Sequence, residues 1–344
     1  MRTERIASKI KAFGADCYIT LDQSERLYLT NFSSSFGIVI VTSKGEGIFI
    51  TDGRYIERAK EEVKGFRLVQ WKGWDNLLSL LKEEKIESAV IDPDRIKLST
   101  YQKLKESIEI KSYQGFLSEF RSVKEEEEIV RIARAVQTAE LALKSVLHLL
   151  KPGITELEFR RELISAFFKL GGEGEAFPTI VASGKGSAVP HWETSNKEIK
   201  DGEVVIVDFG TRYKGYVSDI TRTFLVGKVP EEIREIYEVV REAQELGVKE
   251  LKEGKSCREV DLAVRKFIES KNFGEFFVHS TGHGIGLEVH EAPTLSKNSN
   301  EILRKNNVVT VEPGIYLPGL GGVRIEDDCL VTESGSFRLS ELPR

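Results

Sequence analysis

The chain lacks the features that would place it in a membrane or in an oxidising compartment. Its 344 residues contain no run approaching the roughly 18–20 apolar residues that a membrane span needs. The three cysteines, Cys17, Cys257 and Cys329, are scattered without ligand spacing, which is typical of reduced thiols in a cytosolic protein. Residues 1–9 have the pattern of a charged amphipathic helix and not of a signal peptide. We therefore expect a cytoplasmic protein that does not enter the membrane.

The sequence also has no basic footprint for nucleic acid. Its 50 Lys and Arg residues are interspersed with 55 Asp and Glu residues, and the net charge is −5. No GxGxxG run follows a predicted strand and no Walker-type lysine is present, so nucleotide binding is not predicted. A charged content of 31% with a single methionine leans towards a thermophilic source.

The length predicts two domains, because 344 residues are many for a single hydrophobic core. Residues 1–121 alternate strand and helix patterns, which indicates a small α/β domain. An acidic run then follows Ser122, and Ser122 and Glu125 have the spacing of a helix cap. We therefore place the second domain at residues 122–344, beginning with a long helix that ends near residue 150.

A first hairpin carrying two acids is predicted in the middle of the second domain. Residues 204–210 form a β-branched apolar run interrupted by Asp208, and residues 216–224 form the return strand with Asp219 near its start. If the hairpin closes between residues 213 and 214, the two carboxylates lie directly opposite each other, with Cβ atoms about 4.5–5.5 Å apart. A buried pair of this kind needs a shared proton or a cation.

A second hairpin near the end of the chain repeats the arrangement. Residues 308–316 and 323–328 flank a Gly- and Pro-rich turn centred on Gly319, which places Glu312 opposite Glu326. Four converging carboxylates repel one another, and two divalent ions would neutralise them where one would do so only in part. The second domain thus has two passes of helix, helix and acid-bearing hairpin, which indicates a cryptic internal duplication.

Histidines gather around the same two hairpins. A single one would more often be structural, but four of the five lie in the flanking loops and strands: His191, His279, His283 and His290. Glycines on either side of His283 allow its backbone to approach another group closely. The fifth, His148, is predicted to be a packed or partly exposed helix residue. Carboxylates and imidazoles together are the ligands of metal-assisted hydrolysis.

The motifs around these residues resemble the Xaa-Pro peptidases, a family comprising aminopeptidase P and prolidase. They are Val-Asp208-Phe-Gly, Ser-Asp219-Ile-Thr-Arg-Thr-Phe, Thr-Gly-His283-Gly-Ile-Gly-Leu-Glu-Val-His290-Glu, Val-Glu312-Pro-Gly-Ile-Tyr316 and Val-Arg324-Ile-Glu326-Asp, with Asp52-Gly-Arg-Tyr55 in the first domain. The resemblance covers essentially the whole chain. It implies an α+β fold: a pita-bread (creatinase/aminopeptidase) catalytic domain at 122–344 and a smaller N-terminal α/β, creatinase-like domain at 1–121.

The resemblance also implies a role for each matching position. Two divalent ions of Mn, Co, Fe or Zn would be held by Asp208 as a terminal ligand, by Asp219 and Glu326 as bridges, and by His283 and Glu312. Glu312 would in addition carry a proton from the attacking water to the leaving prolyl nitrogen. Around the ligands, His191, His279 and His290 would steady the substrate carbonyl and the intermediate. Arg324 would orient Asp208; Tyr316 either shares that shell or is a packed aromatic.

The family's chemistry suits an Xaa-Pro bond, a tertiary amide without an N–H for general peptidases to read. A first domain reaching Phe120 argues against a methionine aminopeptidase. The intact ligand set argues against creatinase and against non-catalytic binding proteins that reuse the fold, which remain the remote alternative.

Two activities within the family are harder to separate. Aminopeptidase P accepts peptides of any length with proline second, whereas prolidase accepts only dipeptides. Some dipeptidases carry an arginine shortly after the His-Glu pair to grip the free carboxylate, but this chain has Thr294 there. We therefore predict an Xaa-Pro aminopeptidase acting on proline-containing peptides, with Xaa-Pro dipeptidase (prolidase) as the alternative. The resemblance further implies a homodimer.

Overall fold

The computed structural model describes residues 2–344, and the chain forms two compact units. The first ends at Glu119 and the second is Phe120–Arg344, so the division falls inside the short helix α6 (Ser118–Ser122). Along residues 2–344, no helix combines the length and the apolar composition that crossing a membrane requires.

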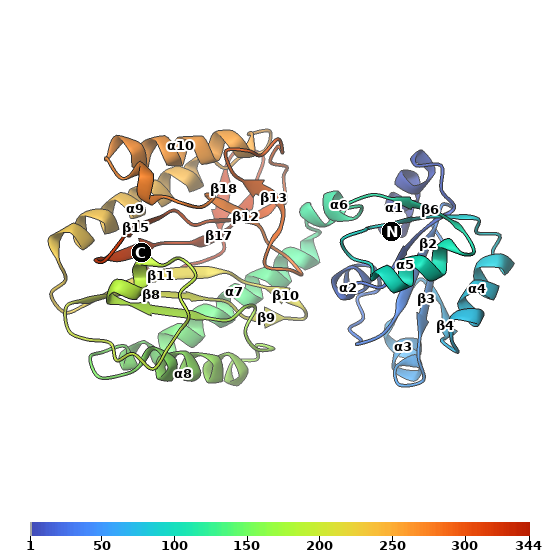
Figure 1. Ribbon diagram of the computed structural model, residues 1–344, viewed down its shortest axis with the longest axis horizontal. Helices are drawn as coiled ribbons and strands as arrows, with labels where there is room; N and C mark the ends of the chain where they lie inside the picture. Colours follow the sequence, from blue (N-terminus) through green and yellow to red (C-terminus); the bar gives the residue numbers. More distant parts are fainter. Residues whose placement is uncertain (1) are drawn as a thin grey trace. The chain divides into compact units, whose positions relative to one another are not determined.

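The first unit is built on a six-stranded mixed sheet with the strand order β4-β3-β2-β1-β5-β6 (Figure 1). Its strands are β1 (Cys17–Thr20), β2 (Ile38–Thr42), β3 (Gly47–Thr51), β4 (Phe66–Gln70), β5 (Ser88–Ile91) and β6 (Glu109–Ser112). Its helices are α1 (Arg2–Ala12), α2 (Gln23–Thr30), α3 (Ile56–Glu62), α4 (Trp74–Glu83) and α5 (Leu98–Lys105). The central strands are buried apolar runs, which is why this unit has the predicted α/β character.

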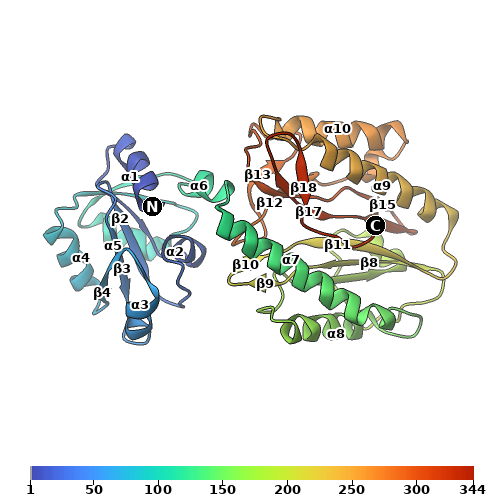
Figure 2. The same cartoon turned by 180° about the vertical axis from the view of Figure 1, so that it is seen from behind.

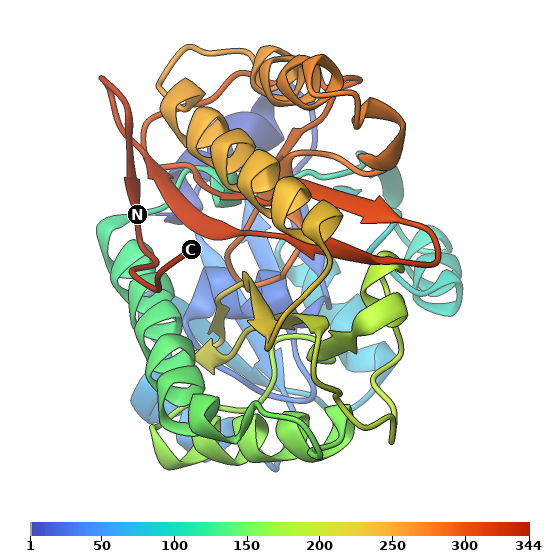
Figure 3. The same ribbon diagram turned by 90° about the vertical axis from the view of Figure 1, so that its left-hand side faces the viewer.

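The second unit places strands between two pairs of helices (Figures 1 and 2). The first pass along the chain comprises α7 (Glu126–Val146), α8 (Glu156–Lys169), β7 (Ile180–Ser183), β8 (Glu203–Phe209), β9 (Arg212–Tyr213), β10 (Tyr216–Val217) and β11 (Ile220–Val226). The second comprises α9 (Glu231–Glu250), α10 (Cys257–Ser270), β12 (Gly282–Gly284), β13 (Glu291–Leu295), β14 (Val308–Val311), β15 (Gly314–Leu317), β16 (Gly321–Arg324), β17 (Asp327–Val331) and β18 (Ser336–Arg338). Figure 3 shows α7 and α8 on one side of the strands and α9 and α10 on the other.

Three sheets and a separate two-stranded ladder fill the space between the helices of the second unit. The sheets have the strand orders β11-β8-β7, β13-β12-β14-β17-β18 and β15-β16, and the ladder pairs β9 with β10. A core cluster on the inner face of α9 contains Ile233, Ile236 and Val240 and reaches Val323 on β16. This packing holds the acid-bearing hairpins against a rigid helix.

The long helix α7 does not begin as predicted. Glu125 is its N-cap, with a capping box in which the Glu125 backbone N–H donates to Glu128 Oε2 at 2.9 Å. Ser122 instead ends α6, and the intervening Val123 forms an isolated bridge with Asn307. The prediction that Ser122 caps the helix is therefore wrong, because the extended backbone between the two helices shifts the cap by three residues.

The register of the first hairpin also differs from the prediction. Tyr213 pairs with Tyr216, so the chain reverses in a two-residue turn at Lys214 and Gly215, both of which have positive φ (49° and 81°). Such a turn matches strand twist and favours glycine. As a result Asp208 pairs with Thr221 and not with Asp219. The two carboxylates are diagonal neighbours, and the predicted direct opposition is wrong.

The register of the second hairpin is as predicted. Gly314 pairs with Arg324 and Leu317 with Gly321, so the turn is centred on residue 319. On the other side of the acids, Val311 pairs with Asp327 in the same register. Glu312 and Glu326 lie between these two ladders and therefore face each other across the hairpin.

Candidate metal centre

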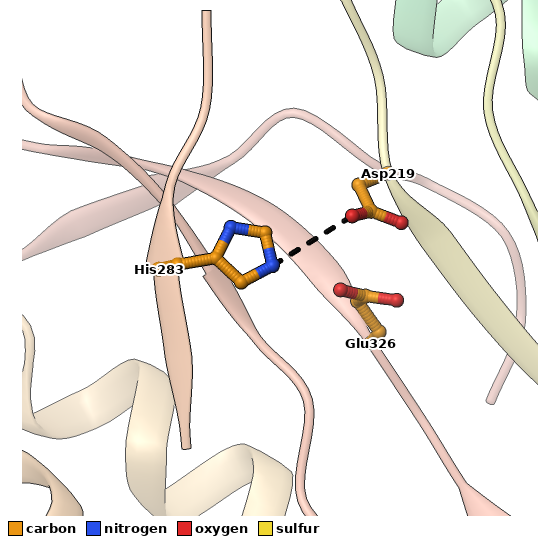
Figure 4. A group of neighbouring side chains, drawn as sticks. All are labelled: Asp219, His283 and Glu326. Atoms are coloured by element: carbon orange, nitrogen blue, oxygen red, sulfur yellow. Dashed lines mark ion pairs between the residues drawn. The ribbon is translucent and has the colours of Figure 1, made fainter. Parts of the chain in front are cut away.

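Three of the predicted ligands converge at one point in the second unit (Figure 4). Asp219, His283 and Glu326 each offer a ligand atom, and these atoms all lie within 4.8 Å of one another. Asp219 directly precedes β11, His283 lies on β12, and Glu326 directly precedes β17. All three residues are buried, so the group is a site built by three separate segments and not a solvated acidic surface.

The other two predicted ligands flank this group. Glu312 lies beside His283, with 3.2 Å between Glu312 Oε1 and His283 Nε2. Asp208 is held by Arg324, whose Nη2 donates to Asp208 Oδ2 at 2.7 Å. The structure thus brings Glu312 against the three-residue group and places Asp208 on the neighbouring strand β8, close enough for its charge to raise the pKa of Asp219.

The electrostatics of the centre divide the acids into two kinds. Burial, and then the charge of nearby carboxylates, raises the pKa of Asp219 and of Glu326 well above the ordinary value. Burial also raises the pKa of Asp208, although Arg324 opposes this. Glu312 differs: burial raises its pKa, but the hydrogen bond and charge of His283 outweigh burial and bring the pKa to about 2.

The residues present fit divalent cations. Asp208 Oδ1 is buried and has no hydrogen-bond partner, although an unsatisfied carboxylate oxygen is costly. The His283 Nδ1 must donate to the Gly284 carbonyl, 3.1 Å away, so Nε2 is the nitrogen that faces the acids and would bind a cation once it has lost its proton. Four carboxylates with one imidazole form a donor set that Mn, Co, Fe or Zn accepts.

A buried hydrogen-bond chain runs outward from Asp208. Arg324 Nη1 donates to the Tyr316 hydroxyl at 2.8 Å, and that hydroxyl lies 2.8 Å from His279 Nε2. His279 Nδ1 donates to the Ser280 carbonyl, so Nε2 accepts from Tyr316 when the ring is neutral. Burial lowers the pKa of His279, which favours the neutral ring. Tyr316 is therefore a link between Arg324 and His279 and not only a packed aromatic.

The remaining histidines occupy different positions. His290 is exposed and its ring centroid lies 4.3 Å from that of His283. His191 is exposed on the loop after β7. The pKa of His290 is lowered mainly by burial and by the charge of His283, and the charge of His191 is near enough to lower it further. His148 is exposed in a 3-10 turn (Leu147–Leu149) that follows α7.

Two threonines contact the acids but were not singled out from the sequence. Thr221 Oγ1 donates to Glu326 Oε2 at 2.7 Å. Thr310 Oγ1 donates to Glu312 Oε1 at 3.2 Å and accepts from the His283 backbone N–H at 3.1 Å. Each orients an acid and shields one of its oxygens. The available signal was their spacing: Thr221 lies two residues after Asp219 and Thr310 two residues before Glu312, so each faces the same side of an extended chain as an acid.

Asp328 is the third residue that sequence reasoning missed. Its Oδ2 accepts the backbone N–H of Asp219 at 3.0 Å, while its Oδ1 is buried without a partner. Burial raises the pKa of Asp328 to about 8. The run Glu326-Asp-Asp328 was visible in the sequence, but nothing in it indicated that the last member fixes the backbone of a different hairpin.

Comparisons with known proteins agree on the family. The model of metallopeptidase family M24 matches residues 130–333, and that of the creatinase/prolidase N-terminal domain matches residues 2–123. An Xaa-Pro dipeptidase from Bacillus anthracis has a TM-score of 0.97 and 41% identity, covering 99% of this chain and 97% of its own. An X-Pro aminopeptidase from Thermotoga maritima has a TM-score of 0.93 and 36% identity, covering 100% and 99%.

A relative known by its sequence points the same way. The Xaa-Pro dipeptidase of Pyrococcus furiosus is 38% identical over 311 residues, which is 90% of this chain and 88% of the relative. These matches confirm the predicted α+β fold, with a creatinase-like first domain and a pita-bread second domain. The chain therefore belongs to metallopeptidase family M24 and is a metal-dependent peptidase of the Xaa-Pro group.

Proposed function

We propose that this protein is an Xaa-Pro aminopeptidase, which removes the N-terminal residue from peptides with proline in the second position. The observation that carries the proposal is the convergence of Asp219, His283 and Glu326 on one buried point. Glu312 beside His283 and the unpartnered Oδ1 of Asp208 extend the donor set to five residues. We propose that these five hold two divalent ions.

The bound ions would supply an activated water and would polarise the scissile carbonyl. Glu312 is suited to move the proton because its carboxylate lies beside the three converging residues, within reach of a water that the ions would activate. Its Oε1 accepts a hydrogen bond from Thr310 at 3.2 Å, so we expect Oε2 to take the proton from the attacking water. The same atom then delivers it to the leaving prolyl nitrogen.

The histidines would act on the substrate and not on the ions. His290 and His191 are exposed beside the centre, where each could donate to the substrate carbonyl or the tetrahedral oxyanion. His279 has both ring nitrogens engaged, by the Ser280 carbonyl and by Tyr316, so we expect it to hold the hydrogen-bond chain that leads to Arg324. Arg324 would in addition keep Asp208 in one orientation, which second-layer hydrogen bonds usually do for metal ligands.

The position after the His-Glu pair supports the aminopeptidase mode. Thr294 pairs with His283 across β12 and β13, so a side chain at 294 projects from the same face as the imidazole. It is exposed and neutral, and it offers no cation for a free prolyl carboxylate. Without that grip, a longer peptide is not disfavoured.

Prolidase activity is the second candidate. It is favoured by the similarity to two proteins named as Xaa-Pro dipeptidases, one of them with a TM-score of 0.97. The two candidates differ in what they require beyond proline, a free carboxylate or a further residue.

Hydrolysis of Ala-Pro and of Ala-Pro-Ala tests the proposal directly. Metal-free protein would be resupplied with Mn²⁺, Co²⁺ or Zn²⁺, and the released amino acids and the bound ions per chain would both be measured. Release of alanine from the tripeptide, with two ions per chain, is the expected result. Cleavage of the dipeptide alone would make the protein a prolidase, and cleavage of neither substrate with any ion would refute the peptidase proposal.

Substitutions at Thr294 sharpen the distinction. Thr294→Arg should raise kcat/KM for Ala-Pro relative to Ala-Pro-Ala by about tenfold, the effect of one hydrogen bond to a charged group. Thr294→Gln is the matched control, since it adds length without charge, and it should leave the ratio unchanged. An unchanged ratio in Thr294→Arg would mean that this position does not face the end of the substrate.

A further inference from the structure

The loop that carries His290 is built around one buried carboxylate. Glu291 Oε1 accepts the backbone N–H groups of Leu287 at 2.9 Å and Glu288 at 3.1 Å. The same carboxylate is ion-paired with Arg121 and with Lys124, whose Nζ lies 3.0 Å from Oε2. Glu291 thus closes the loop on itself and ties it to the start of the second unit.

The two cations are committed to this loop. The side chain of Arg121 is 5% exposed, and its Nη2 also donates to Glu288 Oε2 at 2.7 Å. The Lys124 side chain is 1% exposed, and its Nζ donates to the Arg121 carbonyl at 2.7 Å. Burial raises the pKa of Glu291, but Lys124 and Arg121 outweigh it and lower the pKa to about 2. Stability alone does not explain why two charged side chains are buried this deeply, since apolar residues would stabilise the fold equally well.

The Glu291 carboxylate lies directly against the backbone of Gly286. A Cβ added to Gly286 would lie 2.7 Å from Glu291 Oε2 and 3.0 Å from Oε1. The carboxylate therefore rests directly on the loop backbone. Glu291 follows His290 in the chain, and the two amides it binds precede His290, so the backbone is fixed on both sides of that histidine.

We propose that Arg121, Lys124 and Glu291 are positioning residues that hold the His290 ring beside His283. The inference rests on the proposed function for the catalytic meaning of His290, but the placement of the ring stands on the contacts above. Glu291 acts through backbone amides, and the two cations act through Glu291. None of the three touches the proposed ligands.

The first test observes His290 without any metal or substrate. The chain has five histidines, so the ring signals of histidine-labelled, metal-free protein can be assigned with single histidine substitutions. The 4.3 Å between ring centroids predicts an NMR cross-peak between His290 and His283 ring protons. Arg121→Met and Gly286→Ala should both abolish it. Arg160→Met removes another paired arginine, on α8 and away from the loop, and should preserve it.

The second test is a double-mutant cycle on Xaa-Pro hydrolysis by the metal-loaded enzyme. Arg121→Met should lower kcat by about 10- to 100-fold, with KM changed by less than about twofold, because the ring is misplaced and not removed. Adding His290→Ala to Arg121→Met should then cost less than about threefold, since the two act as one unit. Arg121→Lys, which restores a cation, should recover part of kcat.

The outcomes separate this inference from the proposed function. Retention of the cross-peak in both Arg121→Met and Gly286→Ala would overturn it, as would a His290→Ala effect undiminished in the Arg121→Met background. If Arg121→Met does not fold, Gly286→Ala decides, because it displaces the carboxylate without deleting any charged side chain of the cluster. If the parent cleaves no Xaa-Pro peptide, the proposed function fails, and the cross-peak still decides whether the cluster positions the ring.

Discussion

Removing the Arg324 guanidinium should weaken both the fold and the metal centre. Arg324 is 4% exposed and donates to Asp208, to Tyr316 and, at 3.2 Å, to Thr221 Oγ1. Breaking one partner of a buried pair costs about 3–5 kcal/mol, because the other charge is left uncompensated. In Arg324→Met the uncompensated charge is Asp208, which already faces other buried acids. We expect the metal-free protein to lose that amount of unfolding free energy.

Arg324→Met should also bind the metal ions more weakly, and the size of this effect can be estimated separately. Loss of an outer hydrogen-bond partner typically reduces metal affinity by about 10- to 100-fold. At a fixed, saturating ion concentration, this loss of affinity lowers the stabilisation that the bound metal gives the folded protein by roughly 1.4–2.7 kcal/mol more. Urea unfolding with and without Mn²⁺, together with calorimetric titration of the ion, measures the two effects separately.

A matched variant distinguishes this account from general destabilisation. Arg222 is 3% exposed and its Nη2 lies 2.6 Å from Asp327 Oδ1. It touches the proposed ligand Glu326 only at the backbone carbonyl, to which Nη1 donates at 2.6 Å, and not at the carboxylate. Arg222→Met should therefore destabilise the metal-free protein by a similar amount and change Mn²⁺ affinity by less than about threefold. If Arg324→Met binds Mn²⁺ as tightly as Arg222→Met, Arg324 does not orient a ligand and the reasoning is wrong.

Other predictions follow from buried acids. Because burial and mutual repulsion raise the pKa values of Asp219 and Glu326, their ionisation destabilises the metal-free protein, and its unfolding free energy should increase as pH falls from 7.5 to 5.5; a decrease in urea experiments would contradict this. Saturating Mn²⁺ should abolish that gain. The depressed pKa of Glu291 predicts the opposite pH dependence, because its ionised form stabilises the fold. Glu291→Gln should lower the unfolding free energy by about 3–5 kcal/mol at pH 7, and by progressively less as pH falls through 4 toward about 2. Acid-unfolding curves of the two proteins measure this difference. Glu156→Gln should cost about 1–3 kcal/mol in urea, because Glu156 Oε2 accepts Trp192 Nε1–H at 3.0 Å and an amide nitrogen there cannot; equal stability would show that this buried carboxylate is dispensable.

The two hairpins show where sequence reasoning about register succeeds. Around Gly319 the Gly- and Pro-rich turn is nearly symmetric, and the ladders on both sides of Glu312 and Glu326 keep one register. In the first hairpin the sequence Tyr213-Lys-Gly-Tyr216 allows closure at either of two centres. The positive φ of the two-residue turn selects the one that moves Asp219 two positions from opposition to Asp208.

The sequence by itself determined the fold class, and it predicted the acids and histidines that we propose for the centre. Alternating and periodic apolar patterns specify strands and helices locally, and the proposed ligand residues are few, chemically distinctive and embedded in recognisable motifs. Only the tertiary structure decided what supports them. Arg121 lies 170 residues from Glu291, and neither is distinctive in a chain with 50 basic and 55 acidic residues. Their pairing exists because folding buries both charges together, and burial is the quantity that a charge pattern along one chain does not contain.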